Sequence, residues 1–551
     1  MKGMLKDRLR ELDELYPVWE KKTIWEHFTD TADRFPDRSF IVAQGREPYT
    51  YRQTKEESLR IAKGFLAAGV RPGSHLALQM ENGPEQIFTA LAASAVRAVK
   101  IPVNPSLSAS ELKFVLNQSE AEYLAADGPL RPEAEQAGLK QVIHLGEAGS
   151  LKGLPVTGWE SFLAAGQGME IPWLGKAEYG DEPSDIIYTS GSTKAPKGVL
   201  LTHDMLMRSA FASCRSRGFE LGRRIFVPLP MFHVYGYVEG LLAAILVGGT
   251  VLLRKGKFVA RPVLDFMEEG KANDILSVPS QMMALITELK ERPRSLKSLH
   301  AVYCSAAACP SWVWPQIRKN LGVDDVITGY GMTEVCGASM QTAPDDTDEI
   351  LQTRVGRILP GGCSGLEELG GRQIAYRVVD RKTGLDCAPG ETGELWCKGL
   401  VVTKGYFKRD QANARVFTSD GWFKTGDCGC FDEKGYLILA GRVDDMYKIN
   451  GENVSPQFLE EVLSSCPQIY TVCVTGVPDQ KHGQVGAAFL QLYEDTPQNR
   501  ETAEAYAREH LAKFQVPKYF IYLKTEDWPR TSTGKIQRFR LKEMAQAAVG
   551  K

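Results

Sequence analysis

The N-terminal part of the chain alternates amphipathic stretches with short apolar runs. Apolar side chains recur at helical spacing over residues 53–69 and 84–96, and compact apolar runs occur at 76–80, 99–103 and 123–126. Spacing of three and four residues predicts helices with one buried face, whereas short continuous apolar runs predict buried strands. The resulting strand–helix–strand order predicts a parallel sheet with helices on its faces.

A helix start and a weakly patterned stretch accompany this sheet. Ser108 is followed three residues later by Glu111, a pair that satisfies free amide groups at a helix N-terminus. Residues 128–180, by contrast, are rich in Gly, Pro and Glu and show little periodicity. We expect them to connect two sheet subdomains.

The alternation resumes after residue 198, which predicts a second sheet subdomain. Its strand candidates are 225–227, 250–253, 275–278, 301–303 and 326–328, and its helical stretches are 236–247, 261–270, 280–290 and 311–320. Ligands of open parallel sheets gather at the carboxyl ends of the strands. Small or polar residues follow four strands, at 228–233, 279–280, 305–308 and 329–334. We expect these four segments to face one cleft.

The pattern changes again in the C-terminal part. From about residue 355, glycines separate short strand-like runs such as 373–379, which predicts a small β-barrel subdomain. After residue 444, Ser455-Pro456 predicts the start of a helix with Phe458 and Leu463 on its apolar face. Further strands and a helix follow, so about a hundred residues after 444 look like a separate α+β domain.

Composition and charge exclude several classes of protein. Of the 551 residues, 24% are charged and 43% hydrophobic, as in ordinary soluble globular proteins. The net charge of −2 gives no argument for a nucleic acid or an anionic membrane as partner. The start of the chain lacks the apolar core of a secretory signal, and the longest apolar run, 240–253, is too short to span a bilayer. The eleven cysteines form no C-x-x-C pair, which favours reduced thiols in a cytoplasmic protein over metal or disulfide roles.

One loop carries the chemistry around which the other segments are arranged. Tyr188-Thr-Ser-Gly-Ser-Thr-Lys-Ala-Pro-Lys-Gly198 ends the apolar run 186–188 and leads through Val199 towards a helical pattern. Small residues allow close approach to a phosphate, hydroxyl and amide groups donate hydrogen bonds, and lysine adds charge. We interpret it as a loop around a polyphosphate. A plain turn is the alternative, because Ser, Thr and Gly clusters are common in turns and the Walker A pattern is absent.

Five motifs together carry a resemblance to a known family. They are Thr189-Ser-Gly-Ser-Thr with Pro196-Lys-Gly198, Gly329-Tyr-Gly-Met-Thr-Glu334, Thr425-Gly-Asp427, Gly441-Arg442 and Gly534-Lys535. In this order they resemble the adenylate-forming superfamily of acyl-CoA synthetases, beetle luciferases and peptide-synthetase adenylation domains. The resemblance extends from about residue 24 to 545. It implies that a carboxylate reacts with ATP to give an acyl-adenylate and pyrophosphate, and that the acyl group then passes to the thiol of coenzyme A.

The resemblance implies roles at the phosphates. The β- and γ-phosphates would be held by the loop residues Thr189, Ser190, Gly191, Ser192, Thr193 and Lys197. Thr333 would donate to the α-phosphate, and Glu334 would hold Mg²⁺, which prefers hard oxygen ligands. Lys535 would bring positive charge to the reacting oxygens, where positioning and charge neutralisation provide most of the catalysis.

The resemblance also implies an adenosine site. Tyr330 would stack on adenine, with Ala307 and Ala308 beside the ring. Asp427 would accept bonds from the ribose hydroxyls, and Arg442 would add a donor near the sugar. Taken singly, an acid at a turn is usually structural and a tyrosine is usually part of a core. The joint occurrence of these residues in the family's order favours the functional interpretation.

Three positions depart from the family's usual pattern. Lys194 stands where glycine is common, which restricts the backbone and adds charge near the phosphates, and a structural role is favoured for it. Ser305-Ala-Ala-Ala-Cys309 stands where two glycines are commoner, so added methyl groups would crowd the adenine or acyl side of the cleft. Gln484 stands where the family often has glutamate.

The resemblance further implies two domains that move. An N-terminal domain over 1–441 would hold two parallel-type sheet subdomains and the small β-barrel, and a mobile α+β domain would cover 442–551. Asp444 matches the family's hinge by position, and short polar termini of elements often serve as hinges. After rotation, Lys448 would face the tunnel through which the thiol of coenzyme A enters.

The segment Pro230-Met-Phe-His-Val-Tyr-Gly236 matches the family's acyl site, with His233 near the carboxylate. No acid occurs in this segment to pair with an ammonium, and Glu239 lies beyond it, which argues against amino-acid substrates. The apolar neighbours favour a medium-chain fatty or aryl acid. They are Phe232, Val234, Tyr235, Val278 and Met332.

The sequence therefore predicts a cytoplasmic acyl-CoA synthetase that uses ATP, Mg²⁺ and coenzyme A, acts as a monomer or homodimer, and binds neither nucleic acid nor a membrane by a spanning segment. A stand-alone adenylating enzyme that loads a carrier protein is the nearest alternative. The absence of an appended carrier domain favours free coenzyme A, and no peroxisomal Ser-Lys-Leu ends the sequence. A catalytically silent nucleotide sensor is a second alternative, which the presence of Lys535, Glu334 and Asp427 disfavours.

Overall fold

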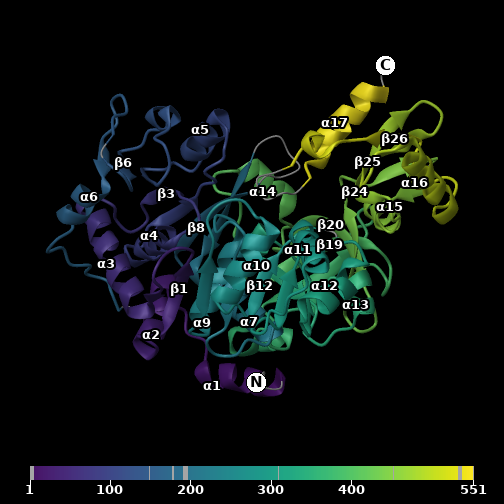
Figure 1. Cartoon of the computed structure of the whole chain (residues 1–551). Coiled ribbons are helices and arrows are strands. Elements are labelled where there is room, and N and C mark those ends of the chain that lie inside the picture. The colour runs from purple at the N-terminus through teal and green to yellow at the C-terminus, as the bar shows by residue number, and fades with distance from the viewer. Residues whose placement is uncertain are drawn as a thin grey trace.

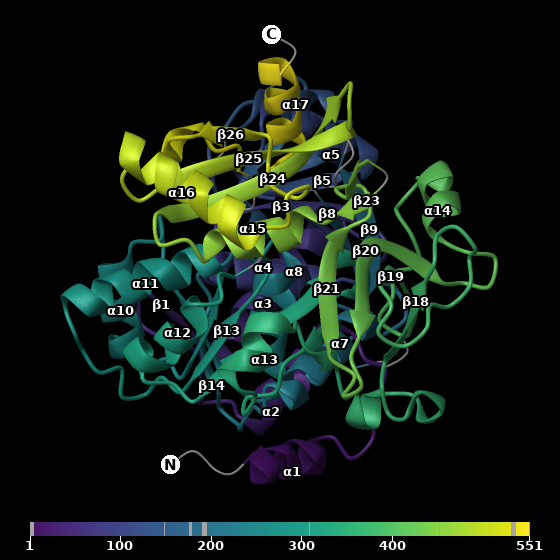
Figure 2. The ribbon, with the colours of Figure 1, turned by 90° about the vertical axis from the view of Figure 1, so that its right-hand side faces the viewer.

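The fold is taken from a computed structural model, which describes residues 5–147, 149–175, 179–189, 196–307, 309–450, 452–530 and 536–549. Two sheets with their helices lie side by side, and the C-terminal elements lie beyond them at the upper right of Figure 1. The smaller sheets within residues 329–358 and 374–442 are antiparallel, and the second of them lies at the right-hand side of Figure 2. The predicted α/β class with additional subdomains is confirmed.

The first sheet has seven strands in the order β7-β6-β5-β3-β4-β8-β9. In that order the strands are Val156–Gly158, Gln141–His144, Tyr123–Ala126, His75–Gln79, Val99–Pro102, Pro183–Thr189 and Lys197–Thr202. Its neighbouring strands are parallel except for β8 and β9, which are antiparallel. The accompanying helices are α3 (Tyr51–Ala67), α4 (Pro84–Ala95), α5 (Ala109–Gln118) and α6 (Trp159–Ala165). The capping box predicted at Ser108 and Glu111 is present at the start of α5.

The prediction for residues 128–180 was wrong. Instead of connecting two subdomains, this stretch adds β6 and β7 to the edge of the first sheet. The two strands have four and three residues, so neither is long enough to show a period among the surrounding glycines and prolines.

The second sheet has the order β14-β13-β12-β10-β11-β1-β2. In that order its strands are Asp325–Ile327, Ala301–Cys304, Asp274–Ser277, Arg224–Phe226, Thr250–Leu253, Ser39–Ala43 and Tyr49–Thr50. Its helices and those that pack between the sheets are α1 (Leu5–Leu15), α2 (Ile24–Arg34), α7 (His203–Ser216), α8 (Val234–Gly236), a π-helical turn (Tyr237–Leu242), α9 (Ala243–Leu246), α10 (Ala260–Glu269), α11 (Pro279–Glu291) and α12 (Val313–Leu321). The sequence pattern located the middle strands but not β1, which comes from the start of the chain and pairs in parallel with β11.

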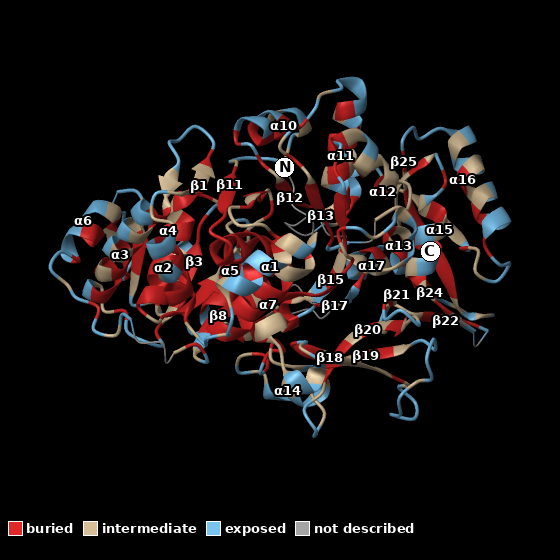
Figure 3. Ribbon diagram, turned by 90° about the horizontal axis from the view of Figure 1, so that it is seen from below, coloured by how far each residue is buried: buried red, intermediate tan, exposed pale blue. Residues whose placement is uncertain are grey.

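The core lies between the two sheets, where the red ribbons are concentrated in Figure 3. Alternate residues of one strand supply different clusters, since Ile225 belongs to the core between the sheets and Phe226 to the cluster on the other face. This alternation follows from the period of two in a strand. The apolar run predicted not to span a bilayer is divided between the helical turns after Gly240 and strand β11. No helix in the described ranges is long and apolar enough to cross a membrane.

The glycine-rich region forms two antiparallel sheets. One contains β15 (Gly329–Met332), β16 (Gly337–Gln341) and β17 (Arg357–Ile358), and the other contains β18 (Ile374–Val379), β19 (Gly393–Gly399), β20 (Phe423–Phe431) and β21 (Leu437–Arg442). The two sheets share a small core of Tyr330, Met340, Leu395 and Leu437. This shared core places strand β15 beside the end of β20. The short helices α13 (Asp348–Thr353) and α14 (Asp410–Val416) flank this region.

The C-terminal elements surround their own sheet, in the order β23-β22-β25-β24 with β26 beside β25. These strands are Glu452–Val454, Tyr447–Ile449, Gly483–Leu492, Ile469–Asp479 and Tyr519–Tyr522, and the helices are α15 (Pro456–Ser464), α16 (Pro497–His510) and α17 (Arg538–Val549). Ser455 caps α15 as predicted, and Leu463 is buried. Phe458 was placed on the buried face incorrectly, because it is 46% exposed.

Candidate active site

The phosphate-loop candidate joins two paired strands. Thr189 ends β8, Lys197 begins β9, and the two residues are cross-strand partners. Both are half-buried. Residues 199–202 continue β9, and α7 begins at His203, so the expected passage from this stretch into a helix is confirmed. The other loop residues of the prediction, Ser190, Gly191, Ser192, Thr193 and Lys194, lie outside the described residues.

Tyr406 brings the two ends of the predicted phosphate and metal site together. Its hydroxyl donates to Glu334 Oε1 over 2.8 Å, and Lys197 Nζ lies 4.8 Å from its ring centroid. Burial and the nearby Glu334 carboxylate raise the pKa of Tyr406, so the phenol stays protonated and keeps donating at neutral pH. Sequence analysis did not identify this tyrosine.

Backbone bonds fix the segment that carries Tyr406. The amide of Thr403 donates to the carbonyl of Glu334 over 2.7 Å, while Leu200 donates to Gly405 and Phe407 donates to Gly198 over 3.1 and 2.8 Å. Residues 403–407 therefore join strand β9 to the 3-10 turn Thr333–Val335. Thr333 is buried in that turn, and Glu334 is half-buried.

A second bonded group forms at the predicted ribose site. Tyr330 donates its hydroxyl to Asp427 Oδ2 over 2.7 Å, and Arg442 Nη1 lies 3.4 Å from Asp427 Oδ1. Asp427 and Arg442 are cross-strand partners on β20 and β21, so the sheet register itself brings these charges together. These contacts bring the three motifs together, and the nucleotide-binding roles assigned to them stay predictions. Burial and the Asp427 charge raise the pKa of Tyr330.

The predicted adenine segment follows strand β13. Ala307 is exposed there, Ala308 lies outside the described residues, and Tyr330 is only 7% exposed because its ring belongs to the small core. Ser305 Oγ donates to the carbonyl of Gly329 over 2.8 Å, which joins this segment to the strand that carries Tyr330. Ala306 has a φ of 72°, a left-handed conformation that favours glycine. The departure from glycine in this segment therefore introduces backbone strain at one position.

The predicted acyl segment is held by a residue from the other sheet. Asn82 donates to the carbonyl of Leu229 over 2.8 Å and accepts from the amide of Met231 over 3.0 Å. His233 follows this turn, is half-buried, and its carbonyl accepts from Tyr237 over 3.0 Å as the helical turns begin. Asn82 was not identified from the sequence, because the contact joins distant parts of the chain.

Glu239, the nearest acid after the acyl segment, is already bonded. It is 1% exposed and accepts from the amide of Ala338 over 3.0 Å, from Gln341 over 3.3 Å and from Ser213. Burial raises the pKa of Glu239, although Arg217, 3.8 Å away, opposes this rise. The carboxylate therefore belongs to a buried structural network.

The C-terminal candidates occupy different places. Lys535 lies outside the described residues, and the bridge between Arg530 and Ile536 flanks its segment. Lys448 is exposed on β22. Asp444 is exposed in the turn between β21 and β22, and its role as a hinge stays a prediction.

Arg538, three residues after Lys535, was not identified from the sequence. Its guanidinium lies 2.9 Å from Glu460 Oε2 and 3.3 Å from Asp445 Oδ2, and it donates to the carbonyl of Val474 over 2.6 Å. These bonds join the start of α17 to helix α15, strand β24 and the residue after Asp444.

Comparison with known proteins identifies the family. A family model described as AMP-binding enzyme matches residues 28–407, and the model of the AMP-binding enzyme C-terminal domain matches residues 459–535. The chain belongs to the AMP-binding enzyme family. The two matches leave the predicted boundary at 441–442 between them, so that boundary stays a prediction.

Relatives along nearly the whole chain agree with this assignment. The putative acyl-CoA synthetase YngI of Bacillus subtilis is 30% identical, with 95% of this chain and 96% of the relative covered. The 2-succinylbenzoate–CoA ligase of Bacillus licheniformis is also 30% identical, with 96% and 99% covered. The solved structure of o-succinylbenzoate coenzyme A synthetase (MenE) from Bacillus subtilis with ATP and magnesium ion superposes with a TM-score of 0.80 at 27% identity, covering 95% of this chain and 99% of that one. The AMP-binding enzyme described here is thus of the AMP-forming CoA ligase class.

Proposed function

We propose that this enzyme joins a medium-chain fatty or aryl carboxylic acid to coenzyme A, using ATP and releasing AMP and pyrophosphate. The observation that supports the proposal most strongly is that Lys197, Tyr406 and Glu334 lie together, as do Tyr330, Asp427 and Arg442. Two motifs far apart in sequence meet in the first group, and three motifs meet in the second.

The first step forms one bond and breaks one bond. A carboxylate oxygen of the acid attacks the α-phosphorus of ATP, and pyrophosphate leaves with its bonding electrons. Lys197 would neutralise charge on the β- and γ-phosphates, while Thr333 would donate to the α-phosphate. Lys535 would supply a cation to the oxygens on which charge develops, and His233 would lie beside the carboxylate. Such groups act by position and charge and undergo no covalent change.

The donor set at Glu334 fits Mg²⁺ bound together with a nucleotide. Its carboxylate provides hard oxygens, and Tyr406 fixes one of them. In the described ranges no three His, Cys, Asp or Glu side chains gather as a metal cage. Mg²⁺ commonly uses one or two carboxylates together with phosphate oxygens. When bound, Mg²⁺ neutralises phosphate charge.

The second step transfers the acyl group. The sulfur of coenzyme A attacks the acyl carbon, the bond to AMP breaks, and the thiol proton is released. We propose that Asp444 is the hinge about which residues 442–551 turn between the steps, and that Lys448 then faces the entering thiol. The exposed turn at Asp444 and the separate core of the C-terminal elements support this division.

The substrate class follows from the acyl segment. Val234 is buried in the core between the sheets, and Tyr235, Val278 and Met332 pack against that core, so apolar surface surrounds the segment of His233. Glu239 is occupied by its own network, which leaves it unsuited to pair with a substrate ammonium. The name of the succinylbenzoate relative also favours an aryl acid.

We propose a cytoplasmic location as a monomer or homodimer. The unpaired state of the eleven cysteines supports a reducing compartment.

A carboxylate panel tests the proposal. The purified protein is mixed with ATP, Mg²⁺, coenzyme A and one acid at a time, and AMP release and thioester are both measured. We expect acid-dependent AMP and thioester in equal amounts, and loss of both when Mg²⁺ is chelated. Adenylation that proceeds with a carrier protein but gives no thioester with coenzyme A would instead establish a carrier-loading enzyme. ATP binding without turnover on any acid would contradict the proposal.

A further inference from the structure

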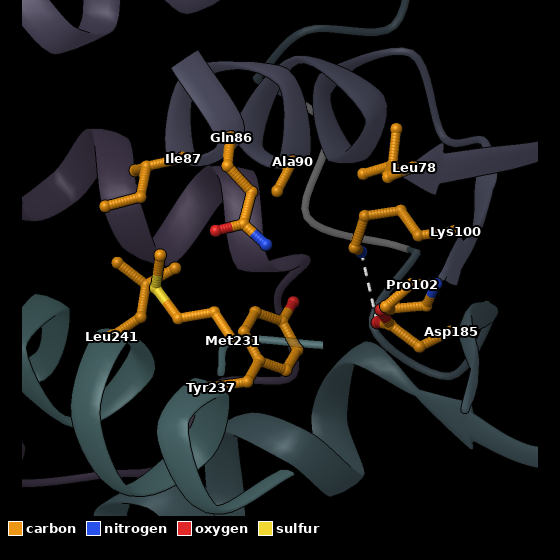
Figure 4. Close-up of a pocket in the computed structure, with 10 residues that line it drawn as sticks. All are labelled: Leu78, Gln86, Ile87, Ala90, Lys100, Pro102, Asp185, Met231, Tyr237 and Leu241. Atoms are coloured by element: carbon orange, nitrogen blue, oxygen red, sulfur yellow. Dashed lines mark ion pairs between the residues drawn. The ribbon is translucent and has the colours of Figure 1, made fainter. Parts of the chain in front are cut away.

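A small cavity lies beside the acyl segment, between β3, β4 and β8, helix α4 and the helical turns after His233 (Figure 4). Its volume is about 20 Å³. Met231 and Tyr237, which flank His233 in sequence, turn their side chains towards it. The cavity is therefore built partly from the same segment that forms the proposed acyl site.

A buried ion pair forms one wall. Lys100 on β4 and Asp185 on β8 are cross-strand partners in the first sheet, with Lys100 Nζ 3.1 Å from Asp185 Oδ2. Their side chains are 2% and 0% exposed. Lys100 also donates to the hydroxyl and the carbonyl of Ser184 over 2.9 and 3.3 Å, and the Ser184 hydroxyl donates to Asp185 Oδ2 over 2.7 Å. The ammonium is thus fully engaged.

Two acceptors that line the cavity are left without donors. Asp185 Oδ1 and Gln86 Oε1 are buried and have no hydrogen-bond partner, and both residues line the cavity. Figure 4 shows the Gln86 amide reaching into the space opposite the Lys100–Asp185 pair. Buried acceptors without donors are costly and rare, so their joint occurrence at a cavity indicates a missing donor group.

Size and charge restrict that donor. A space of about 20 Å³ holds one group the size of water. Lys100 and Asp185 neutralise each other, so a charged ligand group would enter the cavity without a compensating partner. The fitting chemistry is one neutral hydroxyl group: a ligand hydroxyl donates to one of the two acceptors, and a bound water donates to both.

We propose that the cavity is the far end of the acyl site and binds a hydroxyl group of the substrate. The substrate class is then a hydroxylated carboxylic acid, with the hydroxyl remote from the carboxylate. This inference rests on the proposed function, because it assumes that an acid is activated beside His233. It adds Gln86, Lys100 and Asp185 as residues that determine specificity.

Matched acids test the inference. Unsubstituted fatty acids of increasing chain length are each compared with the acid of the same length that carries a terminal hydroxyl, and kcat/KM is measured by AMP release. At the length that reaches the cavity we expect the hydroxy acid to be preferred by roughly tenfold, since it supplies a donor to a buried acceptor. Preference for the unsubstituted acid, or no preference at any length, overturns the inference and leaves a bound water only.

Variants connect the preference to the cavity. Lys100→Met/Asp185→Leu removes both charges together and should reduce the preference ratio to about one. Gln86→Leu removes one of the two unpaired acceptors and leaves the ion pair in place. It provides the test if the double variant does not fold. The matched control is Arg8→Met/Asp325→Leu, which removes another buried ion pair, 3.3 Å apart, between α1 and β14. The control should keep the wild-type preference for the hydroxy acid. An unchanged preference in both cavity variants overturns the inference.

The two proposals fail in different ways. If no acid supports AMP release, the proposed function falls and the cavity assignment falls with it. If acids are activated but the hydroxy and unsubstituted acids have equal kcat/KM at every chain length, only the cavity assignment is overturned.

Discussion

The two sides of the candidate active site are built differently. On the side of the N-terminal body, Tyr330 bonds to Asp427, and Tyr406 joins Glu334 to the strand of Lys197. Arg442, the first residue of the predicted C-terminal domain, pairs with Asp427. On the C-terminal side, Arg538 bonds to residues of its own region, while Lys535 lies just beyond the described residues. The candidate nucleotide-binding side chains of the N-terminal body are thus held in place by their own contacts, whereas the C-terminal elements are organised around a separate core.

Few of the observed bonds cross between the two regions near the hinge. Val443 donates to the carbonyl of Gly426 over 2.9 Å, and Ser455 Oγ donates to the carbonyl of Ala440 over 2.6 Å. The first bond lies at the turn after β21, and the second joins β21 to the start of α15, which lies near β21 in Figure 2. The Tyr406–Glu334 and Tyr330–Asp427 bonds lie within the N-terminal body, so a rotation of residues 442–551 would leave both intact, whereas the Asp427–Arg442 pair spans the predicted boundary. This difference is what we expect if the nucleotide site is fixed in the N-terminal body and Lys535 is carried to it by the proposed rotation of the C-terminal domain.

The largest expected effect comes from removing that cation. Lys535→Ala should lower acid-dependent pyrophosphate exchange roughly a hundredfold or more, because the charge is needed where negative charge develops in the transition state. ATP affinity, measured by calorimetry, should change little, since the N-terminal body holds the nucleotide. The matched control is Lys513→Ala, an exposed lysine of the same region. Equal losses of ATP affinity and exchange would contradict a division between a fixed site and a moving cation.

Restricting the hinge should separate the two steps. Asp444→Pro locks the φ angle in the exposed turn between β21 and β22, so rotation should be impaired while the starting arrangement persists. We expect pyrophosphate exchange to be retained and thioester formation to fall by more than roughly tenfold. Asp444→Ala removes the same carboxylate without fixing φ and should behave like the wild type. Equal loss of both steps in Asp444→Pro would remove the hinge assignment.

A smaller effect is expected at the fixed ribose site. Asp427→Asn removes the charge that faces Tyr330 and Arg442 but keeps the shape, and it should weaken ATP binding roughly three- to tenfold. Calorimetric titration with ATP measures the change. Asp432→Asn is the control, because Asp432 follows the same strand but pairs with Arg354 over 2.9 Å. A change confined to the thioester step would place Asp427 outside the nucleotide site.

The sequence predicted most elements and the order of the motifs, because amphipathic periods and turn residues are local properties. The prediction for residues 128–180 failed because β6 and β7 have only four and three residues, too few to show a period among the surrounding glycines and prolines. The exposed side of α15 was misjudged at Phe458, since helical spacing does not say where an apolar face ends. Contacts such as Asn82 with Met231 and Tyr406 with Glu334 could not be predicted, because they depend on how distant segments pack.

Tyr406 gives the smallest expected effect and the most specific one. Tyr406→Phe keeps the ring beside Lys197 and removes only the hydroxyl that donates to Glu334. One such bond contributes about 0.5–1 kcal/mol, which corresponds to a roughly two- to fivefold rise in the Mg²⁺ concentration required for half-maximal pyrophosphate exchange. Tyr376→Phe is the control, because its hydroxyl bonds Ser339 over 2.7 Å and not a proposed metal ligand. If Tyr406→Phe changed the maximal rate but not the Mg²⁺ requirement, Tyr406 would position the loop of Lys197 and not the carboxylate of Glu334.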